Sequence, residues 1–166
     1  MKEKDELMNT HLYDVTVTWT GNRGEGTKSY RGYDRDHEIT AEGREPIAGS
    51  SDPSFRGDPT RWNPEQLQVV ALSQCHMLWY LHLAATAGVI VLDYTDDARG
   101  VMALNLDGGG QFVQVVLRPT VTVSANSDIE TARRLHLEVP AKCFITRSVN
   151  FPVLHEPQIL RASAKP

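Results

Sequence analysis

Cysteine, positive charge and uninterrupted apolar sequence are all scarce in this chain. It has two cysteines in 166 residues, and 21 acidic residues outnumber 17 lysines and arginines, for a net charge of −4. So few cysteines do not make a disulfide framework, and an acidic balance argues against nucleic acid as a partner. Residues 1–9 lack the apolar run of a secretory signal, so we expect a cytoplasmic protein. The length indicates one domain over 1–166, with 1–10 and 162–166 expected to fray.

The stretch from residue 63 to residue 88 is typical of one long helix. Asn63 is a favoured N-cap, Pro64 fits the first turn, and Gly88 supplies a left-handed residue at the end. Apolar side chains lie nearly all the way round such a helix, so we expect it to be buried on every side.

One polar seam interrupts this helix. Gln68, Cys75 and His82 recur every seven residues and therefore share one groove. A membrane span is the competing interpretation. We expect no membrane insertion, because a single span would hold five polar residues that are expensive in lipid: Gln68, Ser73, Gln74, His76 and His82.

Short strands and a second helix are predicted around the long one. The stretch 43–62 has the composition of a loop and is long enough to be a lid or a binding loop. The alternative is a plain surface excursion with a short helical turn after Asp52-Pro53. A capping box at Ser127 predicts a helix that runs to Val139. Strands are predicted at 11–19, 27–30, 38–41, 89–94, 101–106, 112–123 and 151–160. This order indicates an α+β fold of antiparallel sheets around a buried central helix.

The central helix also predicts how the chain associates. One sheet can cover only one flank of a helix that is apolar all round, and the other predicted elements are short. A second copy of the helix would cover the rest, so we expect an intertwined homodimer.

Cys75 has two interpretations from the helix alone. Its helical neighbours, Ala71, Leu72, Leu78 and Trp79, form an apolar wall. Burial there would raise the pKa of the thiol and favour an inert core cysteine, whereas a reactive Cys75 would need a cation nearby.

Five segments, taken together, resemble one family. The segments that match in order and spacing are Gly21–Gly24, Asn63–Leu67, Ala71–Cys75, Cys143–Ile145 and Ser148–Asn150. The chain from about residue 13 to residue 153 thereby resembles the OsmC/Ohr family of osmotically inducible and organic hydroperoxide resistance proteins.

The resemblance implies a cysteine-based peroxidase that reduces organic hydroperoxides without a cofactor or a metal. Cys75 would be the peroxidatic thiolate and Cys143 the resolving thiol. Arg23 would lower the pKa of Cys75 and orient the peroxide, and Glu65 would hold Arg23 by a salt bridge. An external dithiol, lipoamide-like or thioredoxin-like, would reduce the resulting disulfide.

The substrate expectation follows from apolar side chains near Cys75. Leu72, Leu78 and Trp79 would favour alkyl or fatty-acid hydroperoxides over hydrogen peroxide. Phe55 and Trp62, in or beside the long loop, would add to this surface.

Helix geometry adds a constraint. Ten helical residues separate Glu65 from Cys75 by roughly 15 Å, too far for both to touch one guanidinium from neighbouring positions. Either the first helical turn bends away or the site is assembled from two chains, and we hypothesise the latter. Arg56 and Arg61 in the long loop compete with Arg23 as the cation.

The second cysteine segment departs from the family pattern in two ways. Val139-Pro140 stands where the family often has an Ala-His pair, and Lys142 directly precedes Cys143. These departures leave the position of Cys143 open.

Two other classes of function remain as alternatives. A metal site could draw on the cysteines and histidines, but none has a close-pair spacing. The ligands would come from Cys75, His76, His82, His136, Cys143 and His155. The other alternative is a non-enzymatic dimer of the same fold that binds an apolar ligand or senses thiol oxidation.

Overall fold

The structure is a computed structural model and describes residues 10–163. Within that range no helix is long and apolar enough to cross a membrane. The chain divides between Pro64 and Glu65 into two compact units. The fraying expected at the termini falls mainly on residues 1–9 and 164–166, which lie outside the described residues, while Ala162 is held by a backbone hydrogen bond to Val123 O at 2.8 Å.

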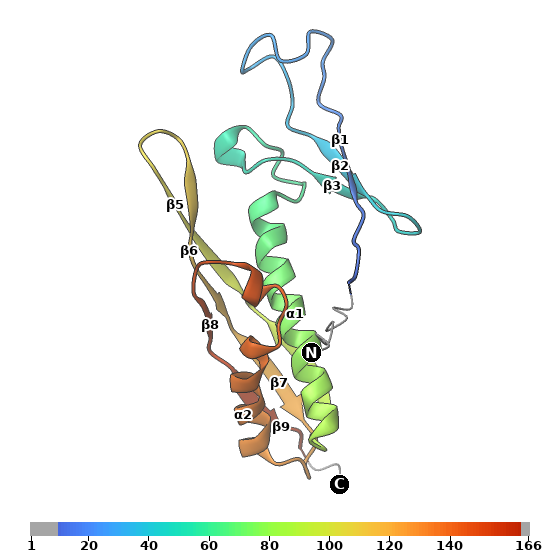
Figure 1. The fold of residues 1–166 in the computed structure, drawn as a ribbon, viewed down its shortest axis with the longest axis vertical. Helices are drawn as coiled ribbons and strands as arrows, with labels where there is room; N and C mark the ends of the chain where they lie inside the picture. Colours follow the sequence, from blue (N-terminus) through green and yellow to red (C-terminus); the bar gives the residue numbers. More distant parts are fainter. Residues whose placement is uncertain (1–9, 164–166) are drawn as a thin grey trace, which may run out of the picture. The chain divides into compact units, whose positions relative to one another are not determined.

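The first unit is built on a three-stranded antiparallel sheet in the order β1-β2-β3 (Figure 1). Its strands are β1, Thr16–Trp19; β2, His37–Thr40; and β3, Ile47–Gly49. The strand predicted at 27–30 is wrong, because that segment consists of turns and bends.

The long stretch 43–62 is more ordered than a plain loop. It contains β3 and a short 3-10 helix, η1, Pro53–Phe55. The Asp52 carboxylate caps η1 by accepting a hydrogen bond from Ser54 N at 2.8 Å. The predicted turn after Asp52-Pro53 is therefore present.

The second unit is organised by α1, Pro64–Thr86. The helix predicted from Asn63 to Gly88 is confirmed, and Gly88 has the left-handed φ of 74° that ends it. A Cβ is rarely tolerated at such an angle, which explains the glycine.

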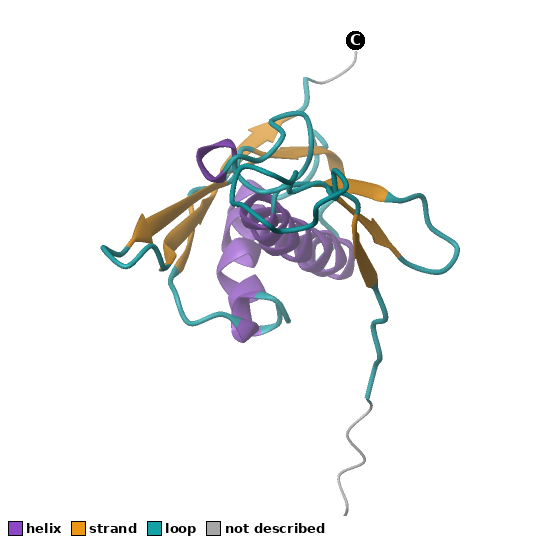
Figure 2. Ribbon diagram, turned by 90° about the horizontal axis from the view of Figure 1, so that it is seen from above, coloured by secondary structure: helices purple, strands orange, loops and turns teal. Residues whose placement is uncertain are grey.

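Two three-stranded sheets pack on this helix, in the orders β4-β7-β9 and β5-β6-β8. Figure 2 distinguishes the helices, in purple, from the strands, in orange. The strands are β4, Val91–Asp96; β5, Arg99–Leu104; β6, Gly110–Leu117; β7, Pro119–Val123; β8, Val153–His155; and β9, Gln158–Arg161.

The strands predicted at 112–123 and 151–160 each divide into two. β6 and β7 belong to different sheets and meet at Arg118-Pro119, where Arg118 N donates to Asp96 Oδ1 at 2.6 Å. Pro119 has no N–H to continue a hydrogen-bond ladder, so the chain changes partners there. β8 and β9 separate at Glu156-Pro157, and Arg118 Nε lies 3.0 Å from Glu156 Oε2. The two sheets thus join at one bend.

Each half of α1 has its own core. Leu72, in the first half, is fully buried with Val115 and Leu117 of β6. Tyr80, in the second half, is fully buried among residues of β4, β7 and the second helix. At about 25 cal/mol per Å² of apolar surface, these two clusters supply the main driving force for folding this unit.

The second helix, α2, spans Ile129–Glu138 and lies beside β9 (Figure 1). Its N-cap is Asp128, whose carboxylate accepts from Thr131 N at 3.0 Å, and not the predicted Ser127. The Ser127 hydroxyl instead forms a hydrogen bond with Ser124 Oγ at 2.8 Å, within the turn that precedes the helix. Two 3-10 turns follow: η2, Val139–Ala141, and η3, Thr146–Ser148.

Candidate functional site

The structure brings the two cysteines together. Cys75 lies half-buried on α1, and Cys143 lies fully buried between η2 and η3. Their Sγ atoms are 2.7 Å apart, with Cys143 as the donor, although 68 residues separate them in the chain. Both are free thiols, placed where a disulfide can form between them.

The turns after α2 fix the position of Cys143. Its backbone N donates to Val139 O at 2.9 Å, and its carbonyl accepts from Arg147 N at 3.1 Å. Its sulfur accepts a longer hydrogen bond from Thr146 N at 3.4 Å. The break at Pro140 therefore does not displace the second cysteine from Cys75.

Two opposing influences act on the Cys75 thiol. Burial is the largest and raises its pKa, and the hydrogen bond with Cys143 raises it further. The backbone N–H groups of Ile145 and Phe144 point toward the sulfur and lower the pKa, because they stabilise a thiolate. Sequence reasoning missed these amides, because their direction depends on the turn that begins η3.

An open apolar surface adjoins the cysteines. Leu78 and Phe144 are 60% and 64% exposed, and the Trp79 ring stands edge-on to Phe144 with centroids 5.7 Å apart. Leu78, Trp79 and His82 line a hollow of about 210 Å³. Leu72, also expected at the substrate, is enclosed in the core with Val115 and Leu117.

The predicted cations belong to the first unit. Arg23 is half-exposed, donates to Arg31 O, and places Nε 3.6 Å from Asp34 Oδ1. Arg61 is more buried and lies 3.4 Å from Asp36. Arg56 ends η1 with a left-handed φ of 65°. The activating role of each arginine stays a prediction.

Three further predicted site residues lie at the end of the first unit and the start of the second. Phe55 is half-buried and Trp62 is 48% exposed. Glu65 has one carboxylate oxygen, Oε2, that is buried without a hydrogen-bond partner among the described residues. A buried carboxylate oxygen without a donor is costly, so Glu65 is suited to receive a cation.

Three histidines gather inside the second unit. His76 on α1 and His136 on α2 are fully buried, with His76 Nε2 2.9 Å from His136 Nδ1, and His155 of β8 stacks on His76 at 4.4 Å. Burial lowers the pKa of His76 to about 3 and that of His136 to about 4. In the part of the chain that the structure describes, no group of three His, Cys, Asp or Glu residues is placed to hold a metal ion.

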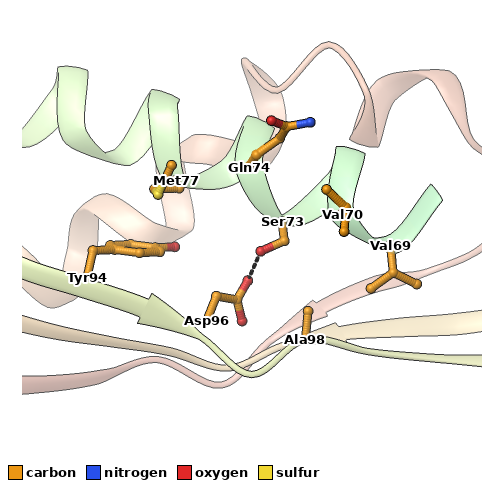
Figure 3. A pocket seen from close by; sticks show the side chains of 8 residues that line it. All are labelled: Val69, Val70, Ser73, Gln74, Met77, Tyr94, Asp96 and Ala98. Carbon is orange, nitrogen blue, oxygen red and sulfur yellow. Dashed lines mark hydrogen bonds between the residues drawn. The ribbon is translucent and has the colours of Figure 1, made fainter. Parts of the chain in front are cut away.

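A second hollow, of about 290 Å³, opens on another face of α1 (Figure 3). Ser73 Oγ donates to Asp96 Oδ2 at 2.5 Å across it, and the Tyr94 hydroxyl is buried without a partner among the described residues. The lining residues are Val69, Val70, Ser73, Gln74, Met77, Tyr94, Asp96 and Ala98. Part of α1 is therefore left uncovered by its own chain.

The chain belongs to the OsmC-like protein family, whose model matches residues 57–156. A solved OsmC-like protein of unknown function from Vibrio cholerae is 32% identical, with a TM-score of 0.80 over 89% of this chain and 99% of that one. The family includes proteins described as organic hydroperoxide resistance proteins.

Two of these have similar folds. One, from Elizabethkingia anophelis, is 18% identical, with a TM-score of 0.64 over 93% of this chain and 100% of that one. A putative one from Vibrio cholerae, with captopril in one of its active sites, is 21% identical, with a TM-score of 0.62 over 91% of this chain and 94% of that one. No curated protein matches this chain.

Proposed function

We propose that this protein is a cysteine-based peroxidase that reduces organic hydroperoxides to alcohols, with Cys75 as the peroxidatic cysteine and Cys143 as the resolving cysteine. The observation that carries the proposal is the 2.7 Å contact between their sulfur atoms. Membership of a family that includes hydroperoxide resistance proteins supports it.

The chemistry proceeds in three steps. The Cys75 thiolate attacks the outer oxygen of the hydroperoxide, the O–O bond breaks, and the inner oxygen takes a proton and leaves as an alcohol. Cys75 is then a sulfenic acid. The Cys143 thiol attacks that sulfur, water leaves, and a disulfide forms. An external dithiol, lipoamide-like or thioredoxin-like, restores both thiols by exchange and is itself oxidised.

Activation of Cys75 is the demanding step, because burial raises the pKa of its thiol. The amides of Phe144 and Ile145 act in the opposite direction but are outweighed. We propose that the Arg23 guanidinium supplies the remaining stabilisation of the Cys75 thiolate. Glu65 would hold Arg23, because its buried Oε2 atom has no hydrogen-bond donor among the described residues. Arg56 and Arg61 are the rival cations.

Apolar surface near Cys75 supports an organic substrate. Leu78, Trp79 and Phe144 offer exposed apolar area that hydrogen peroxide cannot use and an alkyl chain can. Phe55 and Trp62 would extend this surface.

We also propose an intertwined homodimer as the working form, in the cytoplasm. Val70 on α1 is 39% exposed, and Leu92 on β4 is 59% exposed. A second copy packed on α1 would cover such side chains and could contribute residues to the site.

The deciding experiment is stopped-flow reaction of the reduced protein with cumene hydroperoxide and with hydrogen peroxide, with free thiols counted afterwards. The proposal expects loss of two thiols per chain, faster with the organic peroxide, and abolished in Cys75→Ser. Unreactive thiols in the native protein would overturn the peroxidase and favour a ligand-binding or thiol-sensing protein.

A further inference from the structure

Lys142 is a charged side chain at the apolar end of the site. It directly precedes Cys143 and is exposed. Its Nζ lies 5.9 Å from the centre of the Trp79 ring, over the ring face. Trp79 in turn lies one helical turn beyond Cys75, so Lys142 marks one end of the surface that leads to the reactive sulfur.

The surroundings of Lys142 leave its charge available. Some other basic residues of this unit are paired with carboxylates, such as Arg118 with Glu156 at 3.0 Å and Arg134 with Glu138 at 3.6 Å. Within residues 10–163, by contrast, the Lys142 ammonium forms no ion pair with a carboxylate and lies over the Trp79 ring. A cation on an aromatic face keeps its outer side free for an anion.

The rest of the surface is apolar. Trp79 stands edge-on to Phe144 and to His82, with centroids 5.7 Å from each. Apolar contact is non-directional, so it would hold an alkyl chain without deciding which end lies at Cys75. One fixed positive charge at the edge decides that orientation for a substrate with a negative end.

We propose that Lys142 binds an anionic group of the substrate, so that the preferred substrates are amphipathic hydroperoxides carrying a carboxylate, such as fatty-acid hydroperoxides in their free-acid form. The carboxylate pairs with Lys142, and the apolar body lies along Phe144, Trp79 and Leu78. This inference rests on the proposed peroxidase function and makes Lys142 a specificity-determining residue.

The test compares the hydroperoxide of linoleic acid with that of its methyl ester, both below their micelle-forming concentrations, on the full-length reduced protein. Lys142→Gln is expected to lower kcat/KM for the acid by about two- to fivefold, the worth of an exposed ion pair, and to leave the ester unchanged. Lys142→Arg should restore kcat/KM for the acid to the native value. High salt should reduce the preference of the native protein for the acid over the ester.

Arg147→Gln is the matched control, because it removes the same charge from an exposed position four residues beyond Cys143. It should leave the ratio of acid to ester unchanged. If Lys142→Gln changes both substrates equally or neither, the inference is overturned while the peroxidase stands. If the native protein reduces neither hydroperoxide, both are overturned.

Discussion

The Nε2 atom of His76 lies 2.9 Å from the Nδ1 atom of His136, inside a core that excludes solvent. The ring that accepts must be neutral, and burial lowers the pKa of both rings, so both are neutral near pH 7 in the folded protein. His76 Nδ1, His136 Nε2 and His155 Nε2 are each buried without a hydrogen-bond partner among the described residues. Protonation of either ring to an imidazolium would therefore place a positive charge in the core without a partner of opposite charge.

This pair predicts a loss of stability in mild acid. The folded pKa values of about 3 and about 4 are depressed, so the unfolded chain binds these protons first as the pH falls below about 6.5. The free energy of unfolding therefore falls with pH, by about 1.4 kcal/mol per pH unit for each histidine at full slope, until the folded values are reached.

Urea unfolding at several pH values between 6.5 and 4.5 measures this slope. The groups that face the pair from neighbouring strands are His155 of β8, whose own pKa is lowered by burial, and Asp96 of β4, which acts to raise it. Tyr80 stacks on His136 from α1. His82→Gln, at an exposed position, is the control and should leave the slope unchanged; a flat stability profile across this range would contradict the assignment.

Cys143→Ser should separate the two chemical steps of the proposed cycle. Attack of Cys75 on the hydroperoxide does not need Cys143, so the first turnover should stay fast. The sulfenic acid then has no thiol to condense with, and it should accumulate and be trapped by dimedone, with mass spectrometry as the readout. Failure to trap any sulfenic acid, with the first turnover intact, would exclude Cys143 as the resolving cysteine.

Arg23→Ala tests whether Arg23 activates Cys75, and the measurement is the pH dependence of the rate of peroxide reduction. Burial already raises the pKa of the Cys75 thiol, so removal of a stabilising guanidinium should move the pH–rate profile of peroxide reduction to still higher pH. Arg44→Ala in the same unit, whose guanidinium hydrogen-bonds Glu42 O, should leave the profile in place. An unmoved profile in Arg23→Ala would turn attention to Arg56 and Arg61.

The sequence predicted the elements whose causes are local. Asn63, Pro64 and Gly88 mark the ends of α1 through capping and backbone conformation, and the structure confirms that helix. Strand alternation likewise located most strands, because its period depends only on neighbouring residues.

The misses depend on distant partners. The strand predicted at 112–123 divides at Pro119, and the change of sheet there is completed by Asp96, which lies more than twenty residues earlier and binds Arg118 N. Asp128 is the N-cap in place of Ser127, whose hydroxyl accepts a hydrogen bond from Ile90 N, 37 residues earlier. The amides aimed at Cys75 and the histidine pair arise only when three separated elements pack together, which no local pattern encodes.

Leu72 and Leu78 separate support of the fold from contact with the substrate, because they lie on the same helix in opposite environments. Leu72 is fully buried with Val115 and Leu117, so Leu72→Ala should lower the free energy of unfolding by about 2–5 kcal/mol. Leu78 is 60% exposed, so Leu78→Ala should change stability far less.

The kinetic effects should run the other way. Leu78→Ala should raise KM for cumene hydroperoxide and leave the slow reaction with hydrogen peroxide unchanged, because only the organic substrate uses the apolar surface. Leu72→Ala, assayed well below its melting temperature, should retain its preference for the organic peroxide. If Leu78→Ala slows both peroxides equally, Leu78 shapes the site or the dimer and does not contact the substrate.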